Sequence, residues 1–94
     1  MSDEFDPATA LHEHLAATEE LPVEREAGWR LGEAQALAAE LADGGLDDAT
    51  VVRRADEIRT LLAAVDGTGD PEADDHVDAA RELANRIANR PDGG

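Results

Sequence analysis

The sequence predicts an all-α fold, most simply a compact antiparallel four-helix bundle, and three observations lead to this prediction. Apolar residues recur three or four positions apart in four segments, which is the spacing of one helix face. Proline and glycine fall between those segments, where helices start and stop. No stretch alternates apolar and polar residues as a half-buried strand would. The expected helices span about 7–20, 22–43, 48–66 and 71–90.

The first two helices are expected to meet at a proline. Asp6 is a suitable N-cap for the first helix, 7–20, because its carboxylate can accept a hydrogen bond from a first-turn amide. Residues that precede a proline avoid the helical conformation, so this helix should end before Pro22. Its apolar face is short, and a three-helix bundle with this segment as a docking arm is the alternative. The second helix, 22–43, can begin at the same proline, and Gly44 should end it.

The third and fourth helices each follow an aspartate. Asp47 or Asp48 should cap the helix at 48–66, and Asp70 should cap the helix at 71–90. The connections between the helices are short, which favours antiparallel neighbours. The chain of 94 residues is long enough for one helical domain, and we expect its ends, 1–5 and 91–94, to be mobile.

The charge balance predicts where the protein works. Aspartate and glutamate number 23 against 8 basic residues, all of them arginine, and the formal net charge is −15. Such a surface repels itself in dilute buffer, but in molar salt the Debye length falls to about 3 Å and the repulsion is screened. We therefore expect a halophilic protein in a salty cytoplasm. A disordered acidic tail is the alternative, but 41% of the residues are apolar and they recur with helical spacing.

Several classes of protein are disfavoured by what the chain lacks. Without cysteine, disulfides and zinc-thiolate sites are excluded. The acidic N-terminus does not have the pattern of a signal peptide, and no apolar run approaches the ~20 residues that cross a bilayer. We expect a cytoplasmic protein with no membrane partner. Nucleic-acid binding is disfavoured because the arginines form no basic stripe, although an acidic protein can instead mimic nucleic acid.

The second helix has a distinctive outer face of small residues around the only tryptophan. Glycine within a helix costs about 1 kcal/mol relative to alanine, so two glycines four positions apart call for a reason. Small residues at this spacing allow another helix to approach closely. The sequence therefore predicts an interface, either in a homodimer or with an unidentified protein partner. The alternative is an exposed face on which the glycines are simply tolerated. The candidate interface residues are Gly28, Trp29, Gly32, Ala36 and Ala39.

No catalytic set emerges from the sequence. Lysine and cysteine are absent and the only serine is Ser2, so no nucleophile stands beside a base. We expect a protein that is not an enzyme and needs no cofactor. A noncatalytic protein-interaction module is the leading hypothesis.

The histidines and one acidic loop offer weaker signals for metals. His12 and His14 are two positions apart and so point to nearly opposite sides of a helix, while His12 and His76 each border an apolar stripe. A metal- or small-ligand-binding bundle that uses His12 and His76 is therefore an alternative function. The loop at 66–70 resembles a calcium loop but has Pro71 where glycine is required. We predict no specific metal site, only nonspecific binding of salt cations.

Two runs carry a family resemblance, Leu21–Ala34 and Val65–His76. In both, the chain resembles an uncharacterised family of small, acidic, lysine-poor helical proteins from haloarchaea. The resemblance implies a salty cytoplasm and no known activity, and it assigns no functional residue.

Overall fold

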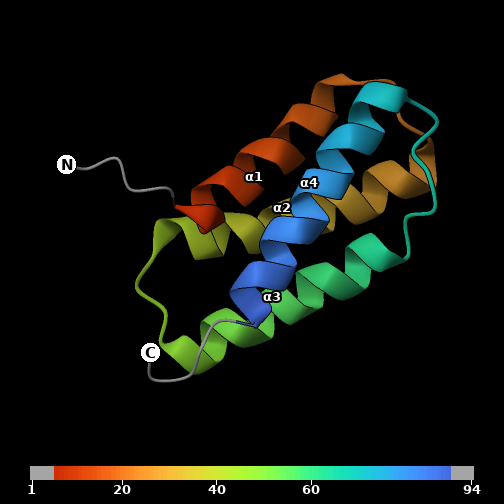
Figure 1. Cartoon of the computed structure of the whole chain (residues 1–94). Helices are drawn as coiled ribbons and strands as arrows, with labels where there is room; N and C mark the ends of the chain where they lie inside the picture. The colour runs from red at the N-terminus through yellow and green to blue at the C-terminus, as the bar shows by residue number, and fades with distance from the viewer. Residues whose placement is uncertain (1–5, 90–94) are drawn as a thin grey trace.

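The all-α prediction is confirmed by a computed structural model, which describes residues 6–89 and contains no strand within that range (Figure 1). A single 3-10 turn, η1, follows the first helix. The elements are α1 (Pro7–Ala17), η1 (Thr18–Glu20), α2 (Arg25–Asp43), α3 (Asp48–Ala63) and α4 (Pro71–Ala88).

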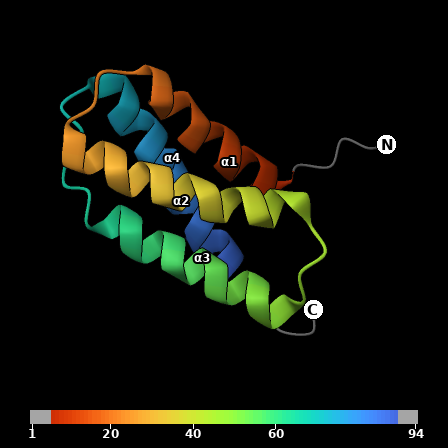
Figure 2. The same ribbon diagram turned by 180° about the vertical axis from the view of Figure 1, so that it is seen from behind.

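The four helices form an antiparallel bundle. Successive helices run in opposite directions, and their connections alternate between the two ends of the molecule (Figures 1 and 2). α1 packs against α2 and α4, and α3 packs against the same two helices. The alternative with the first helix as a docking arm is wrong, because Leu11 and Leu15 of α1 are fully buried.

One core runs through the bundle, and all four helices contribute to it. Its largest fully buried apolar side chains are Leu11, Leu15, Ile58 and Leu62. Alanines occupy many of the other buried positions, so the helices pack closely around a thin core. The buried members are Leu11, Leu15, Leu31, Ala34, Ala38, Leu41, Ala55, Ile58, Leu62, Val77, Ala80, Leu83, Ala84 and Ile87.

Aspartates cap three of the four helices, as predicted. The carboxylate of Asp6 accepts from the amide of Ala8 at 3.2 Å. Asp47, rather than its neighbour Asp48, caps α3 by accepting from the amide of Thr50 at 2.9 Å. Each cap satisfies an amide that has no partner inside the helix.

The first two helices are shorter than predicted. α1 ends at Ala17 and continues only as η1, in which the hydroxyl of Thr18 donates to the carbonyl of Leu15 at 2.6 Å. α2 begins at Arg25 rather than at Pro22. The segment before it is held outside the helix, since the amide of Glu24 donates to the carbonyl of a distant residue, Thr68, at 2.7 Å.

The other two helices also stop early. α3 ends at Ala63 rather than at residue 66 because a side chain of α4 caps it: Nη2 of Arg81 donates to the carbonyls of Leu62 and Val65 at 2.9 and 2.6 Å. α4 ends at Ala88, short of the expected residue 90. The expected mobile ends, 1–5 and 91–94, lie outside the described residues.

A buried threonine organises the connection between α3 and α4. Thr68 is fully buried, and its hydroxyl lies 2.8 Å from the carboxylate of Asp74 and 3.0 Å from the carbonyl of Asp70. Its amide donates to the same Asp74 carboxylate at 2.9 Å, and its carbonyl accepts from the amide of Glu24. These four residues, which we call the Thr68 network, join the start of α2 to the start of α4.

Hydrogen bonds within this network act on the ionisation of Asp74. The amide of Thr68 and then its hydroxyl lower the pKa of Asp74 from its ordinary value, with a smaller contribution from the positive charge of Arg81. At the other end of the bundle, the side chain and the amide of Thr50 lower the pKa of Asp47 in the same way. Both carboxylates are therefore held in the charged form by local donors.

Candidate functional site

Trp29 is the only large apolar side chain exposed in the described part of the chain. It lies on the outer face of α2, and 60% of its surface is accessible. The guanidinium of Arg30 sits 6.0 Å from the centre of the indole ring and is held by an ion pair with Glu26 at 3.1 Å. An indole this exposed loses favourable burial, so its position on the surface calls for an explanation.

An open groove of about 850 Å³ runs beside Trp29, between α2 and α3. The two helices are neighbours in the bundle, as both views of the ribbon show (Figures 1 and 2). Four of the five predicted interface residues line this groove, whereas Ala39 is exposed outside it. The lining residues are Gly28, Trp29, Gly32, Glu33, Ala36, Leu37, Asp56, Glu57, Thr60 and Leu61.

The two glycines on this face differ in what surrounds them. A Cβ atom at Gly28 would lie 3.3 Å from Cγ2 of Val23, so the glycine allows the segment before α2 to pack closely. A Cβ atom at Gly32 would meet nothing within 4 Å. The fold therefore accounts for Gly28 but gives no packing reason for Gly32, although glycine weakens a helix there by about 1 kcal/mol.

The groove is negatively charged. Three carboxylates line it, Glu33 from α2 and Asp56 and Glu57 from α3, and no basic residue does. Asp56 pairs with Arg59 at 3.2 Å, and Glu57 pairs with Arg54 at 3.4 Å. These pairs link residues three positions apart on one helix and are exposed, so they neutralise the rim only in part.

Sequence reasoning found the α2 side of this groove but not the α3 side. The small-residue pattern is visible within a single helix, whereas Asp56 and Glu57 belong to another one. Their presence at the rim depends on how α3 is rotated about its axis. The signal in the sequence was the apolar stripe of this helix, which includes Ala55 and Ile58. Both of these residues are buried, so the two acids between them face outward.

The seam between α1 and α4 holds a histidine pair. Nδ1 of His14 lies 2.9 Å from Nδ1 of His76, and both side chains are half-buried. The sequence indicated His12 as the neighbour of His76, but the structure pairs His76 with His14. One signal could have revealed this, because His14 and His76 each directly precede a buried residue of their helix, Leu15 and Val77.

The two imidazoles meet end to end. Their ring centroids are 5.2 Å apart, which is close to the largest separation that the 2.9 Å contact between nitrogens permits. The N–H of one ring therefore points at the lone pair of the other, and the two Nδ1 atoms do not converge on a third position where a metal ion could sit. Within residues 6–89, no group of three or more histidine, aspartate or glutamate side chains is placed to hold a metal ion.

A second hollow, between α3 and α4, contains two arginines but does not present them to a ligand. Arg81 uses its guanidinium to cap α3, and Arg59 pairs with Asp56. The carboxylate of Glu82 also lines the hollow. This arrangement is a structural link between two helices and not a site for an anion.

Comparison with known proteins gives a family but no activity. A family model described as a domain of unknown function, DUF8152, matches residues 7–93, and the chain belongs to this family. No curated protein and no solved structure matches the chain. Within the described residues, no helix is both long enough and apolar enough to cross a membrane.

Proposed function

We propose that this member of the DUF8152 family is a noncatalytic protein-interaction module, and that the groove between α2 and α3 binds an amphipathic helix of another protein. The observation that carries the proposal is Trp29, a large apolar side chain exposed at the groove. Aromatic side chains of this kind are the usual anchors of protein interfaces.

The floor of the groove is suited to a helix. Gly32 and Ala36 lie one turn apart on α2 and leave room for the backbone of a partner helix. Leu37 and Leu61 add apolar surface from both walls. An apolar helix face laid into such a groove is a recurrent mode of peptide recognition.

The charge of the groove selects between partners. A second copy of this chain would bring three more carboxylates to Glu33, Asp56 and Glu57 and would carry the same net charge of −15. A helix whose apolar stripe is flanked by lysine or arginine would complement the rim instead. We therefore commit to a basic-flanked helix of a different protein rather than to a homodimer.

The acidity also supports a halophilic protein that works in a salty cytoplasm. The ion pairs within residues 6–89 are all formed by arginine with acids on the surface, and they balance only part of the negative charge. Helicity and the unfolding midpoint should both rise as KCl increases from 0.1 to 2 M (roughly, the range over which the Debye length falls from about 10 Å to a few ångströms). Circular dichroism measures both, and a flat response would contradict salt adaptation.

The only tryptophan of the chain serves as the reporter for groove binding. The probe is a synthetic amphipathic helical peptide with a leucine stripe flanked by arginines, and the matched peptide carries glutamates at the same flanks. Titration with the arginine peptide should shift Trp29 emission to the blue with saturation, because the indole leaves water. The glutamate peptide should give no shift.

Three variants of the protein locate the binding site. Gly32→Leu adds a side chain to the groove at a position where a Cβ atom meets nothing within 4 Å, and it should weaken peptide binding by about tenfold or more, because a larger side chain denies a partner helix its close approach. Gly32→Ala should retain most of the binding. Ala39→Leu adds the same side chain on the same helix outside the groove and should bind as the wild type does.

Two outcomes would overturn the proposal. Equal binding by Gly32→Leu and Ala39→Leu would show that the peptide lies elsewhere. A stable homodimer in sedimentation equilibrium in 2–3 M salt (roughly, enough to screen the repulsion), broken by Gly32→Leu alone, would make a second copy the occupant.

A further inference from the structure

We propose that the His14–His76 pair is a proton-sensitive clamp that holds α1 against α4 at neutral pH and releases it on acidification. The two rings belong to the first and last helices of the bundle, and the contact between their Nδ1 atoms is a side-chain hydrogen bond across that seam.

The contact fixes the protonation states of the two rings. A hydrogen bond between two Nδ1 atoms needs one proton, so one ring donates from Nδ1 while the other accepts there and carries its proton on Nε2. In the neutral pair, one histidine is therefore protonated at Nδ1 and the other at Nε2. The end-to-end geometry leaves room for only one proton between the nitrogens.

Successive protons have opposite effects on the clamp. The first can go to an outward Nε2 atom, which leaves the bond in place and makes it charge-assisted and stronger. The second must go to the accepting Nδ1, which puts two N–H groups and two positive charges face to face. The folded pair therefore accommodates one added proton, whereas separated rings accommodate two.

The residues around the pair do not relieve the repulsion between two protonated rings. One turn from His14 on α1 lie only uncharged residues, and α2 presents only apolar side chains to the core. On α4 the carboxylate of Glu72 lies one turn before His76, and Glu13 and Asp75 each precede one of the histidines in sequence. Neither ring is among the ion-paired side chains of residues 6–89, so no carboxylate bridges the two rings when both are charged.

Release of the clamp would free the helix that covers one side of the core. α1 contributes two fully buried leucines, Leu11 and Leu15, which pack among residues of the other helices. The first proton is accommodated by the folded pair, so stability is kept while it is taken up. On further acidification the separated rings bind one more proton than the folded pair, so unfolding takes up a proton and stability falls as the pH falls.

The test is thermal unfolding of the whole chain in high salt between pH 8 and 5.5. Histidines titrate in this window and carboxylates do not, because peptide values are about 6.5 for histidine and about 4 for the acids. The wild type should hold its unfolding midpoint while the first proton is taken up and then lose on the order of 5 °C towards pH 5.5. His14→Gln and His76→Gln should each remove most of this loss, and the double variant should remove no more than either one.

His12→Gln is the matched control, because His12 lies on the same helix two positions away from the pair. It should keep the pH dependence of the wild type. The clamp is refuted if His12→Gln flattens the response as much as the other two variants, or if the wild type shows no loss.

A second measurement on the wild type does not depend on whether the variants fold. Nitrogen-15 NMR of the imidazoles at pH 8 should show one ring protonated at Nδ1 and the other at Nε2, with a coupling across the hydrogen bond. The coupling should persist while the pair holds one added proton and disappear on further acidification, when the second proton enters, together with the protection of α1 amides from hydrogen exchange. Two identical tautomers at pH 8, or a coupling that persists when both rings are charged, would overturn the proposal.

Discussion

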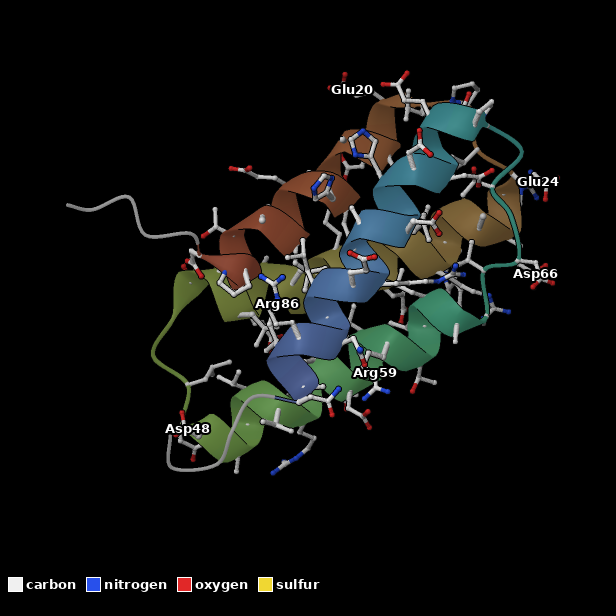
Figure 3. The ribbon with its side chains drawn as sticks, viewed as in Figure 1. Glu20, Glu24, Asp48, Arg59, Asp66 and Arg86 are labelled. Atoms are coloured by element: carbon white, nitrogen blue, oxygen red, sulfur yellow. The ribbon has the colours of Figure 1, made fainter. Side chains whose placement is uncertain are left out.

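The two ends of the bundle are built in different ways. At the end where α2 and α4 begin, the Thr68 network and the Arg81 cap tie three helices together, α3 and α4 through side chains and α2 through the backbone bond from Glu24 to Thr68 (Figure 3 labels Glu24 and Asp66 there). At the opposite end, marked by Asp48, α2 and α3 are joined by a turn in which Gly44 donates to the carbonyl of Leu41. A hollow of about 320 Å³ opens at that second end.

The first end, which we call the tied end, is held by hydrogen bonds between residues far apart in the sequence. The second, which we call the glycine end, is held mainly by the chain connection through Gly44 and Gly45. At the tied end the buried threonine has partners from three segments, so its loss would be felt by α2 and α4 together. At the glycine end the backbone hydrogen bond from Gly44 to Leu41 spans only three residues, and Gly44 and Gly45 both have a φ of 83°. A change there should stay local.

Thr68→Val should have the largest effect on stability. Valine keeps the shape but removes the hydroxyl, so the amide of Asp70 loses its acceptor and the carboxylate of Asp74 loses a donor. We expect a loss of about 2–3 kcal/mol in the free energy of unfolding, because polar groups are left without partners in a buried place. Urea denaturation in high salt measures it.

Thr60→Val is the control for that substitution. Thr60 is exposed, and its hydroxyl donates only to the carbonyl of Asp56 within α3. The change should alter stability by less than about 0.5 kcal/mol. Similar losses for the two variants would mean that the Thr68 network does not hold the tied end.

A pair of glycine substitutions compares the ends directly. Gly69 and Gly44 both have positive φ, 87° and 83°, so alanine is strained at either position. A Cβ atom at Gly69 would also lie 3.1 Å from Cγ of Glu24, whereas one at Gly44 would meet nothing within 4 Å. We expect Gly69→Ala to cost about 2 kcal/mol and Gly44→Ala about 1 kcal/mol, since only the second turn can relax. The reverse order would show that the glycine end is the more constrained.

The smallest expected effect is on the acid sensitivity of the two ends. The pKa values of Asp74 and Asp47 are both lowered in the folded chain by hydrogen bonds from threonines. A carboxyl whose folded pKa is lowered contributes stability above its unfolded pKa, and this contribution is lost as the pH falls through the folded pKa. Asp74→Asn and Asp47→Asn should each be less stable at pH 7 and lose less on acidification from pH 5 to 3.

Double variants that combine these substitutions with Thr68→Val also distinguish the two ends, through the additivity of their effects on the free energy of unfolding. Combined with Thr68→Val, Asp74→Asn should be non-additive because the two residues share hydrogen bonds, while Asp47→Asn should add independently. Additivity of both pairs would argue against a network at the tied end.

Much of the fold could be predicted because its signals are local. Asp6, Asp47 and Asp70 cap helices through amides two or three residues away, a distance that sequence alone specifies. The helix ends that were predicted incorrectly depend on distant residues instead. Glu24 stays outside α2 because of Thr68, and α3 stops early because of Arg81, and both contacts exist only once the bundle has closed.

The candidate sites follow the same division. The small residues around Trp29 form a pattern within one helix, so the sequence indicated that face. The acids across the groove, Asp56 and Glu57, and the pairing of His14 with His76 depend on the rotation of two helices against each other. Residues two positions apart differ by about 200° around a helix, so His12 and His14 face nearly opposite sides, and the packing of α1 against α4 decides which of them meets His76.

The bond between the Glu24 amide and the Thr68 carbonyl has a consequence for how the chain can be divided. Because it joins the two helical hairpins at the end away from Gly44 and Gly45, the covalent link at those glycines is the one the bundle needs least. Fragments 1–44 and 45–94 should reassemble when mixed in high salt and recover the helicity of the intact chain. A 45–94 fragment that carries Thr68→Val should complement 1–44 poorly, because the loop that presents the Thr68 carbonyl to Glu24 loses the hydroxyl bonds to Asp70 and Asp74. The molecule would then behave as two hairpins that recognise each other, with the peptide link between them serving mainly to keep them at high local concentration.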